Sequence, residues 1–174
     1  MRFAIVSDTH DNMANFNKAI DFLNKEGIEI MLHCGDISNQ TTIDEAEKRF
    51  NGNISFVRGN ADYHLDDVPD NLSLDIGGKK VAFIHYPDLA RKLAETGNYD
   101  LVFYGHTHKP WLARIATSAR QSSSLGGGRS VVSGEEKECL LVNPGELAGQ
   151  RFKPTFAIYD TETDKLELKI LEKL

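Results

Sequence analysis

Three short apolar runs in the first third of the chain have the length and composition of buried β-strands. They extend over Phe3 to Val6, Ile28 to Leu32 and Ile54 to Val57, and each stops abruptly at polar residues. Seven later runs also have strand character: Leu72 to Ile76, Lys80 to Ile84, Leu101 to Tyr104, Trp111 to Ala116, Cys139 to Val142, Thr155 to Tyr159 and Leu166 to Leu171. The sequence therefore predicts a core that is rich in strands.

Segments with helical periodicity separate the first strands. One ends at Gly27 and has its apolar residues at the spacing of one helix face: Phe16, Ala19, Ile20 and Leu23. A second helix is expected to begin at a cap formed by Thr41 or Thr42 and to run to about Phe50, and a third to begin at Pro87. Strands that alternate with helices predict parallel βαβ units. We expect the later strands to form a second sheet packed on the first, with the helices outside.

Polar residues that can bind metal follow the ends of five of these strands. They are Asp8 and His10, then Asp36, then Asn60, then His85, and finally His106 and His108, and Asp62 lies near the same rim without being counted among the seven candidates. Because ligand sites in open α/β sheets form at the carboxyl ends of the strands, we expect these side chains to share one rim. Glycines 35, 59 and 105 each precede one of them, where the chain must turn without a Cβ in the way.

The mixture of carboxylate, imidazole and amide oxygen suits a divalent ion such as Mn²⁺, Fe²⁺ or Zn²⁺. Seven such groups exceed the needs of one ion, whereas two ions about 3.5–4 Å apart, bridged by one carboxylate, would use them all. Such a pair clamps a phosphate and lowers the pKa of a bridging water. Any single Asp or Asn here is more often a cap or turn former, and His85 alone is more often structural. The joint arrangement favours a metal centre.

Composition and charge limit the classes of protein to which the chain can belong. The chain has 174 residues, 40% of them hydrophobic, and is expected to form one domain spanning residues 1–174. No apolar run is long enough to span a membrane, and the start is too short and polar for a signal peptide, so we expect a cytoplasmic protein. A net charge of −6 argues against stable nucleic-acid binding, although bound cations would still allow a phosphate-containing substrate.

Two further features follow from composition. The Ser- and Gly-rich stretch at about 118–138 is predicted to be a flexible insertion, with a gating flap or a dimer contact as alternatives. Cys34 and Cys139 lack the spacing of a disulfide framework or a C-x-x-C pair, so both are expected to be reduced and buried.

These motifs resemble those of the calcineurin-like metallophosphoesterase family, and the small size is similar to its compact phosphodiesterase branch. In family order they are Asp8-Thr9-His10, Gly35-Asp36, Gly59-Asn60-Ala61-Asp62, His85 and Gly105-His106-Thr107-His108, with Asn143-Pro144-Gly145 as a later loop. The resemblance implies an α/β fold in which a two-sheet β-sandwich is flanked by helices, an α-β-β-α architecture. It also implies a metal-dependent hydrolase of phosphoric esters, specifically a phosphodiesterase.

The resemblance further implies roles for the candidate ligands. One ion would be held by Asp8, His10, Asp36 and His108, and the other by Asp36, Asn60, His85 and His106. Asp36 would be the bridge, and Asp36, Asn60 and His106 are the expected catalytic residues. The implied nucleophile is a metal-bound hydroxide, and the implied substrate is a small or nucleotide-like phosphodiester. Two Mn²⁺ ions per chain are expected, with Fe, Zn or Ni as alternatives.

The sequence departs from the family pattern at two places. Many members have a histidine directly after the Gly-Asn pair, where it can protonate the leaving group, but here the residue is Ala61. Such protonation contributes about 10²–10⁴-fold, so its loss would favour substrates with good leaving groups. Asp62 or His64 could substitute, although each is more often structural. The second departure is Tyr86-Pro87 in place of Gly-His, which leaves Arg58 or Asn12 as weaker candidates for a phosphate contact.

Two other functions are weighed against a phosphodiesterase. One is a phosphomonoesterase that uses the same metals. The other is a silent scaffold, as in the retromer subunit of this family that keeps the fold but has lost ligands and binds partner proteins. No candidate ligand here is apolar, and clustered carboxylates would be costly without a cation, which favours an enzyme. Self-association into a homo-oligomer through strand edges near the final hairpin is left open.

Overall fold

Ten strands and three helices make up the part of the chain described by the computed structural model, residues 1–117 and 138–174. The strands are β1 (Arg2–Val6), β2 (Ile30–His33), β3 (Asn53–Phe56), β4 (Asn71–Ile76), β5 (Lys79–Ile84), β6 (Leu101–Phe103), β7 (Trp111–Ala116), β8 (Glu138–Asn143), β9 (Thr155–Asp160) and β10 (Lys165–Ile170). The helices are α1 (Met13–Lys25), α2 (Gln40–Arg49) and α3 (Pro87–Glu95), with short 3₁₀ turns η1 (Asn60–Asp62) and η2 (Leu171–Lys173).

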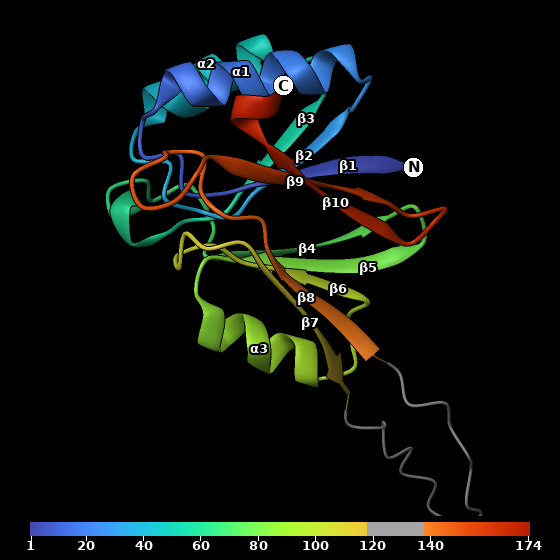
Figure 1. Cartoon of the computed structure of the whole chain (residues 1–174). Helices are drawn as coiled ribbons and strands as arrows, with labels where there is room; N and C mark the ends of the chain where they lie inside the picture. Colours follow the sequence, from blue (N-terminus) through green and yellow to red (C-terminus); the bar gives the residue numbers. More distant parts are fainter. Residues whose placement is uncertain (118–137) are drawn as a thin grey trace, which may run out of the picture.

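The strands form two five-stranded sheets that face each other (Figure 1). The first has the order β10-β9-β1-β2-β3, in which β1, β2 and β3 are parallel. The second has the order β4-β5-β6-β8-β7, in which β5, β6 and β8 are parallel. Helices α1 and α2 cover the outside of the first sheet, and α3 covers the outside of the second. The predicted sandwich of two sheets flanked by helices is confirmed.

The final hairpin lies in a different sheet from the one expected. Strands β9 and β10 were expected in the second sheet, but β9 pairs antiparallel with β1 in the first, with Phe3 opposite Tyr159. Burial explains the placement, because five of the six residues of β9 are buried, as suits a strand with neighbours on both sides. None of the six residues of β10 is buried, and the strand forms the edge of the first sheet.

The start of α2 also differs from the prediction of a threonine cap. The helix begins after Asn39, so Thr41 and Thr42 lie within its first turn rather than at the cap. Thr42 is buried, and its hydroxyl donates to the carboxylate of Asp11 at 2.7 Å. Asn39 donates a side-chain hydrogen bond to the same carboxylate. Both side chains therefore tie α2 to the loop after β1 instead of capping the helix.

The core between the sheets is aromatic and aliphatic. Phe3, Phe83 and Phe103 are completely buried there, and the rings of Phe3 and Phe103 meet edge to face at 5.9 Å. Burying a side chain of this size contributes about 1.5–3 kcal/mol. Cys34 and Cys139 are buried and form no disulfide, as predicted. The strands therefore carry their terminal loops on a rigid, close-packed base.

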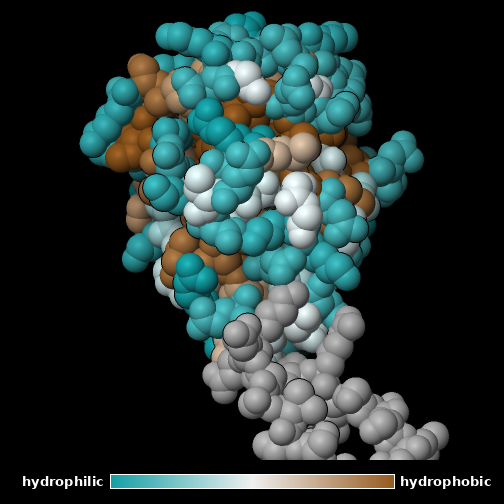
Figure 2. Space-filling view, turned by 90° about the vertical axis from the view of Figure 1, so that its right-hand side faces the viewer, coloured by the Kyte–Doolittle hydropathy of each residue, from teal (hydrophilic) through white to brown (hydrophobic). Residues whose placement is uncertain are grey.

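The predicted insertion at about 118–138 lies outside the described residues, apart from Glu138, which begins β8. Among the helices of residues 1–117 and 138–174, none has both the length and the apolar character needed to cross a membrane. Hydrophilic residues cover most of the face shown in Figure 2, with smaller hydrophobic areas between them.

Candidate metal centre

The seven candidate ligands come together in loops that follow strands of both sheets. The first sheet contributes the loops after β1, β2 and β3, and the second contributes the loops after β5 and β6. The side chains are Asp8, His10, Asp36, Asn60, His85, His106 and His108. The sequence predicted one shared rim, and the rim is built from the facing edges of the two sheets.

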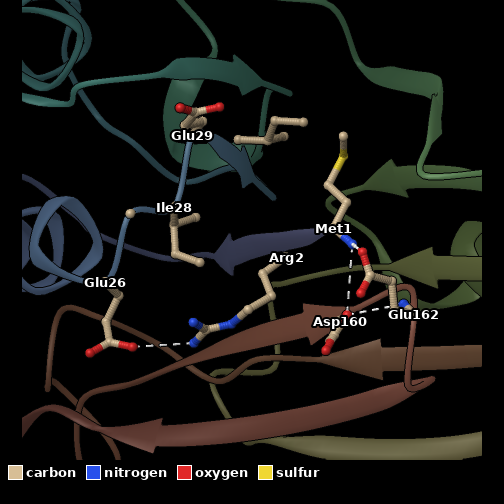
Figure 3. A pocket seen from close by; sticks show the side chains of 9 residues that line it. Met1, Arg2, Glu26, Ile28, Glu29, Asp160 and Glu162 are labelled. Carbon is tan, nitrogen blue, oxygen red and sulfur yellow. Dashed lines mark hydrogen bonds and ion pairs between the residues drawn. The ribbon is translucent and has the colours of Figure 1, made fainter.

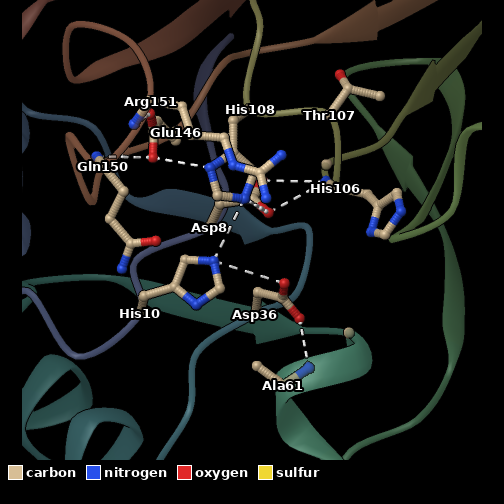
Figure 4. A network of polar contacts seen from close by, with 12 residues as sticks. Asp8, His10, Asp36, Ala61, His106, Thr107, His108, Glu146, Gln150 and Arg151 are labelled. Carbon is tan, nitrogen blue, oxygen red and sulfur yellow. Dashed lines mark hydrogen bonds and ion pairs between the residues drawn. The ribbon is translucent and has the colours of Figure 1, made fainter.

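Four of these side chains form a compact group. Asp8, His10, Asp36 and His108 each offer one ligand atom, and these atoms all lie within 4.8 Å of one another. The Nε2 atom of His108 is 3.4 Å from Asp8 Oδ1 and 3.4 Å from His10 Nε2. Figure 4 shows the three side chains of Asp8, His10 and His108 converging beside Asp36. Two carboxylates and two imidazoles at such spacing match the donors that a divalent transition metal prefers.

A second group lies on the other side of Asp36. His85 Nε2 is 3.5 Å from Asp36 Oδ2 and 3.2 Å from Asn60 Oδ1. His106 Nδ1 is 2.9 Å from Asn60 Oδ1 and 3.2 Å from His85 Nε2. The same Asp36 Oδ2 atom is 3.6 Å from His10 Nε2 in the first group. Asp36 therefore lies between two sets of potential ligands.

Burial and charge at the centre fit a bound cation. Asp8 is completely buried and Asp36 is 2% exposed. Burial raises the pKa of Asp8 to about 8, and the negative charge of Asp36 adds to the rise. Within the described residues, neither carboxylate pairs with a lysine or an arginine. Because a divalent ion would supply the missing positive charge, the residues present fit a metal site.

The backbone is distorted at most of the candidate ligands. Five of the seven have left-handed φ angles between 42° and 68°: Asp8, His10, Asp36, His106 and His108. Such angles are uncommon for residues other than glycine and cost about 1–3 kcal/mol each. They persist because surrounding hydrogen bonds hold the chain, for example from His10 N–H to the Asp36 carbonyl at 3.0 Å. Strain of this kind clusters at functional sites.

Glycines make room for the ligand side chains. A Cβ at residue 59 would overlap the Asp36 carboxylate, and a Cβ at residue 105 would overlap the Ser7 hydroxyl and lie 2.7 Å from Asp8 Oδ2. Only Gly35 of the three predicted glycines has a left-handed φ, at 94°. Gly59 and Gly105 are therefore required for close approach to a ligand rather than for a sharp turn.

His33 holds together two of the loops that carry the candidate ligands and is not itself a candidate ligand. It is completely buried, and burial lowers the pKa of His33 to about 3, so the ring is neutral. The N–H of Gly35 donates to Nδ1 at 3.2 Å, which leaves the proton on Nε2 to be donated to Thr9 Oγ1 at 3.1 Å. The ring thus links the loop after β1 to the loop after β2.

Glu146 also belongs to the centre and was missed by the sequence analysis. Its Oε2 atom is 2.8 Å from His108 Nδ1, and the residue is completely buried (Figure 4). Burial alone would raise the pKa of Glu146, but the backbone N–H groups of residues 150–152 and the His108 ring outweigh it and lower that pKa. The available signal was an acidic residue directly after Asn143-Pro144-Gly145 in a buried stretch.

A sequence model of the calcineurin-like phosphoesterase superfamily domain matches residues 1–164. The chain belongs to this superfamily. It is 31% identical to phosphodiesterase MJ0936 of Methanocaldococcus jannaschii over 188 aligned positions, which cover 99% of this chain and 100% of that protein. The superfamily works with divalent metal ions, so this chain is a metal-dependent hydrolase that acts on phosphoric esters.

Solved structures of similar proteins agree with the superfamily assignment. A structure described as a novel archaeal phosphodiesterase matches with a TM-score of 0.76 and 31% identity, covering 98% of this chain and 99% of that one. Vps29 of Chaetomium thermophilum matches with a TM-score of 0.68 over 97% of this chain and 93% of its own. At 15% identity, the likeness to Vps29 shows only that the fold is shared.

The calcineurin-like site has no side chain for proton transfer at position 61. Ala61 donates its backbone N–H to Asp36 Oδ1 at 2.8 Å, and its methyl group carries no proton donor. Asp62 is buried, and its carboxylate accepts backbone N–H bonds from three residues: Ile37, Ser38 and Gly59. His64 lies against the ring of exposed Tyr63. Asp62 is therefore a structural residue rather than a replacement acid.

The two weaker candidates for a phosphate contact have other partners. The guanidinium of Arg58 pairs with Asp70 at 2.8 Å and with Asp66 at 3.6 Å. Asn12 caps α1, because its Oδ1 accepts from Asn15 N–H at 3.1 Å, and its amide donates to the Ala148 carbonyl at 2.8 Å. Neither side chain is available for substrate in this arrangement.

A separate cavity lies at the opposite end of the first sheet, near the start of β1 (Figure 3). Its charged groups pair with one another: the amino group of Met1 binds Glu162 at 2.9 Å, and Arg2 binds Glu26 at 3.3 Å. The candidate ligands follow the carboxyl ends of the strands, whereas this cavity is lined mainly by residues near the amino ends of β1 and β2. It is therefore distinct from the candidate metal centre.

Proposed function

We propose that the protein is a phosphodiesterase that uses two divalent metal ions to hydrolyse a small or nucleotide-like phosphodiester. The observation that carries the proposal is the position of Asp36, whose Oδ2 atom is 3.6 Å from His10 Nε2 and 3.5 Å from His85 Nε2. One carboxylate between two ligand groups is the arrangement that a two-metal hydrolase requires. The relative with full-length similarity is itself named a phosphodiesterase.

The ligands divide into two sets that share Asp36. One ion would be held by Asp8, His10, Asp36 and His108. The other would be held by Asp36, Asn60, His85 and His106. When bound, the two ions would neutralise the phosphate charge and lower the pKa of a bridging water toward neutrality. Manganese is the proposed ion, with iron, zinc or nickel as alternatives, because the donors are a mixture of oxygen and imidazole nitrogen.

Exposure indicates the side from which substrate approaches. Asp8, Asp36, His85 and His108 are buried at the base of the centre, whereas Asn60 and His106 are exposed. Asn60 and His106 are therefore the two ligands nearest to solvent and would meet the phosphate first. Tyr86 lies on the same side, since its ring centre is 5.5 Å from that of His106 and the residue is 38% exposed.

The charge of the centre favours a diester over a monoester. A phosphomonoester is close to a dianion at neutral pH because its second pKa is about 6, whereas a diester carries one charge. In the described residues, no lysine or arginine side chain contacts the candidate ligands to balance a second charge. The intact ligand set also favours an enzyme over a silent scaffold, because buried carboxylates without a cation are costly.

Turnover of matched substrates tests the proposal. Protein loaded with Mn²⁺, Ni²⁺, Zn²⁺ or Mg²⁺ should hydrolyse an aryl phosphodiester faster than the corresponding monoester. A clear preference for the monoester would instead support a phosphomonoesterase. No turnover of either substrate with any of the four ions would support the scaffold.

The bridging role of Asp36 has its own matched pair of variants. Asp36→Asn should abolish diester turnover, because the neutral amide cannot hold two cations together. Asp75→Asn makes the same chemical change at an exposed position on β4 and should leave turnover unchanged. Wild-type turnover by the Asp36→Asn protein would overturn the assignment.

A further inference from the structure

We propose that Glu146 is a positioning residue that fixes the tautomer of His108, so that the ion in the group of Asp8, His10, Asp36 and His108 is held more tightly. The inference rests on the proposed metal centre and adds a residue that lies outside all of the ligand motifs. It concerns the tautomer of one ligand, His108, and does not change the set of residues proposed to bind the ions.

The His108 ring lies between Glu146 and the first ligand group. His108 Nδ1 is 2.8 Å from Glu146 Oε2, and both residues are buried. The opposite ring nitrogen, Nε2, is 3.4 Å from Asp8 Oδ1. A neutral imidazole carries one proton, so only one ring nitrogen can offer a lone pair to a metal. If Nδ1 donates to Glu146, Nε2 is the nitrogen that faces the ion.

The surroundings of Glu146 make it an acceptor. Its two carboxylate oxygens receive backbone N–H bonds of 3.0, 2.6 and 2.5 Å from three consecutive residues: Gln150, Arg151 and Phe152. A carboxyl group surrounded by donors is held in its acceptor form. The proton between Glu146 and the ring therefore belongs to His108 Nδ1, and the lone pair belongs to Nε2.

The Glu146 loop is also fixed relative to the other ligands. Leu147 N–H donates to the Ser7 carbonyl and Ala148 N–H donates to the Asp8 carbonyl, both at 3.0 Å. These bonds tie the loop after β8 to the loop after β1. Glu146 thus fixes the orientation of the His108 ring relative to Asp8. His108 and Asp8 lie on loops that follow strands of different sheets.

The second ligand group has a weaker partner in the corresponding place. His85 Nδ1 is 2.9 Å from the Cys34 backbone carbonyl, which is a neutral acceptor. A carboxylate partner raises the basicity of a ligating imidazole, and loss of such a partner typically costs 10–100-fold in metal affinity. Removing the charge of Glu146 should therefore weaken the binding of the ion held by His108 and leave the binding of the other ion unchanged.

Glu146→Gln is the sharpest variant because it keeps the shape of the side chain. A glutamine NH₂ group facing His108 would donate to Nδ1 and move the ring proton to Nε2, where it blocks the ion. Titration of the metal-free full-length chain with Zn²⁺ should show about 10–100-fold weaker binding of one ion and unchanged binding of the other. Glu29→Gln, at an exposed position just before β2, should bind both ions as the wild type does.

Nitrogen-15 NMR of the wild type supplies a readout that does not depend on any variant folding. In Zn²⁺-loaded protein, His108 should carry its proton on Nδ1 and bind zinc through Nε2. The reverse assignment would overturn the inference, as would equal binding of both ions by a folded Glu146→Gln protein. If the wild type binds no Zn²⁺ at all, the proposed metal centre itself fails, so the two failures are distinguishable.

Discussion

His106 and His108 come from one short turn but have different neighbours. His106 Nδ1 lies beside Asn60 Oδ1 and His85 Nε2, whereas His108 Nε2 lies beside Asp8 Oδ1 and His10 Nε2. Both have left-handed backbone angles, with φ of 68° and 62°, and their imidazoles reach separate ligand groups. The Gly105–His108 turn would therefore help to set the spacing between the two proposed ions.

Separate alanine substitutions test this division. His106→Ala should lose the ion shared with Asn60 and His85, and His108→Ala should lose the ion shared with Asp8 and His10. Metal analysis of each purified variant should find about one ion fewer than in the wild type. Loss of both ions in each variant would show that the two sites are not separable.

Ala61 permits a gain-of-function test. Ala61→His would place a proton donor next to Asn60, and such a donor contributes about 10²–10⁴-fold where the leaving group is poor. The variant should raise the rate for an alkyl diester more than for an aryl diester, whose leaving group needs little protonation. An equal effect on both substrates would contradict the view that leaving-group protonation is the missing step.

The residue types of the centre could be predicted from sequence, but not the way in which they are held. The candidate ligands stand directly after apolar runs, which marks them as residues at strand ends. Their left-handed angles depend on long-range bonds such as Asp8 N–H to the Gly35 carbonyl, which no local pattern reveals. Glu146 was missed because its link to His108 spans 38 positions.

At the scale of single elements, α1 begins directly after the first ligand loop. Asn12 caps this helix and also binds the Ala148 carbonyl, so it fastens the helix start to the loop that carries Glu146.

Asn12→Ala should lower the free energy of unfolding by about 0.5–2 kcal/mol in urea denaturation, with KM for the diester unchanged. A raised KM without a loss of stability would identify Asn12 as a substrate contact instead.

The order of the strands was harder to predict than their existence. The ten strands of residues 1–117 and 138–174 correspond to segments with strand character in the sequence, but the pairing of β9 with β1 joins residues more than 150 positions apart. Local pattern carries no information about such partners. The threonine cap of α2 failed for a related reason, because Thr42 is bound to Asp11 from another loop.

At the scale of the molecule, the candidate metal centre draws on loops of both sheets. Loops of the first sheet carry Asp8, His10, Asp36 and Asn60. Loops of the second sheet carry His85, His106 and His108. Because the unfolded chain lacks this arrangement, each bound ion should stabilise the folded state, by about 2.7 kcal/mol when free metal is 100 times the Kd of its site. Removing metal with a chelator should therefore lower the Tm, and a Tm unaffected by chelation would contradict this account.

The number of divalent ions bound per chain tests the central claim most directly. Protein stripped with a chelator and reloaded with Mn²⁺ should bind about two ions per chain, as a shared Asp36 bridge requires, and should recover turnover of an aryl phosphodiester. Less than one bound ion per chain, together with no turnover in the presence of any divalent ion, would contradict it.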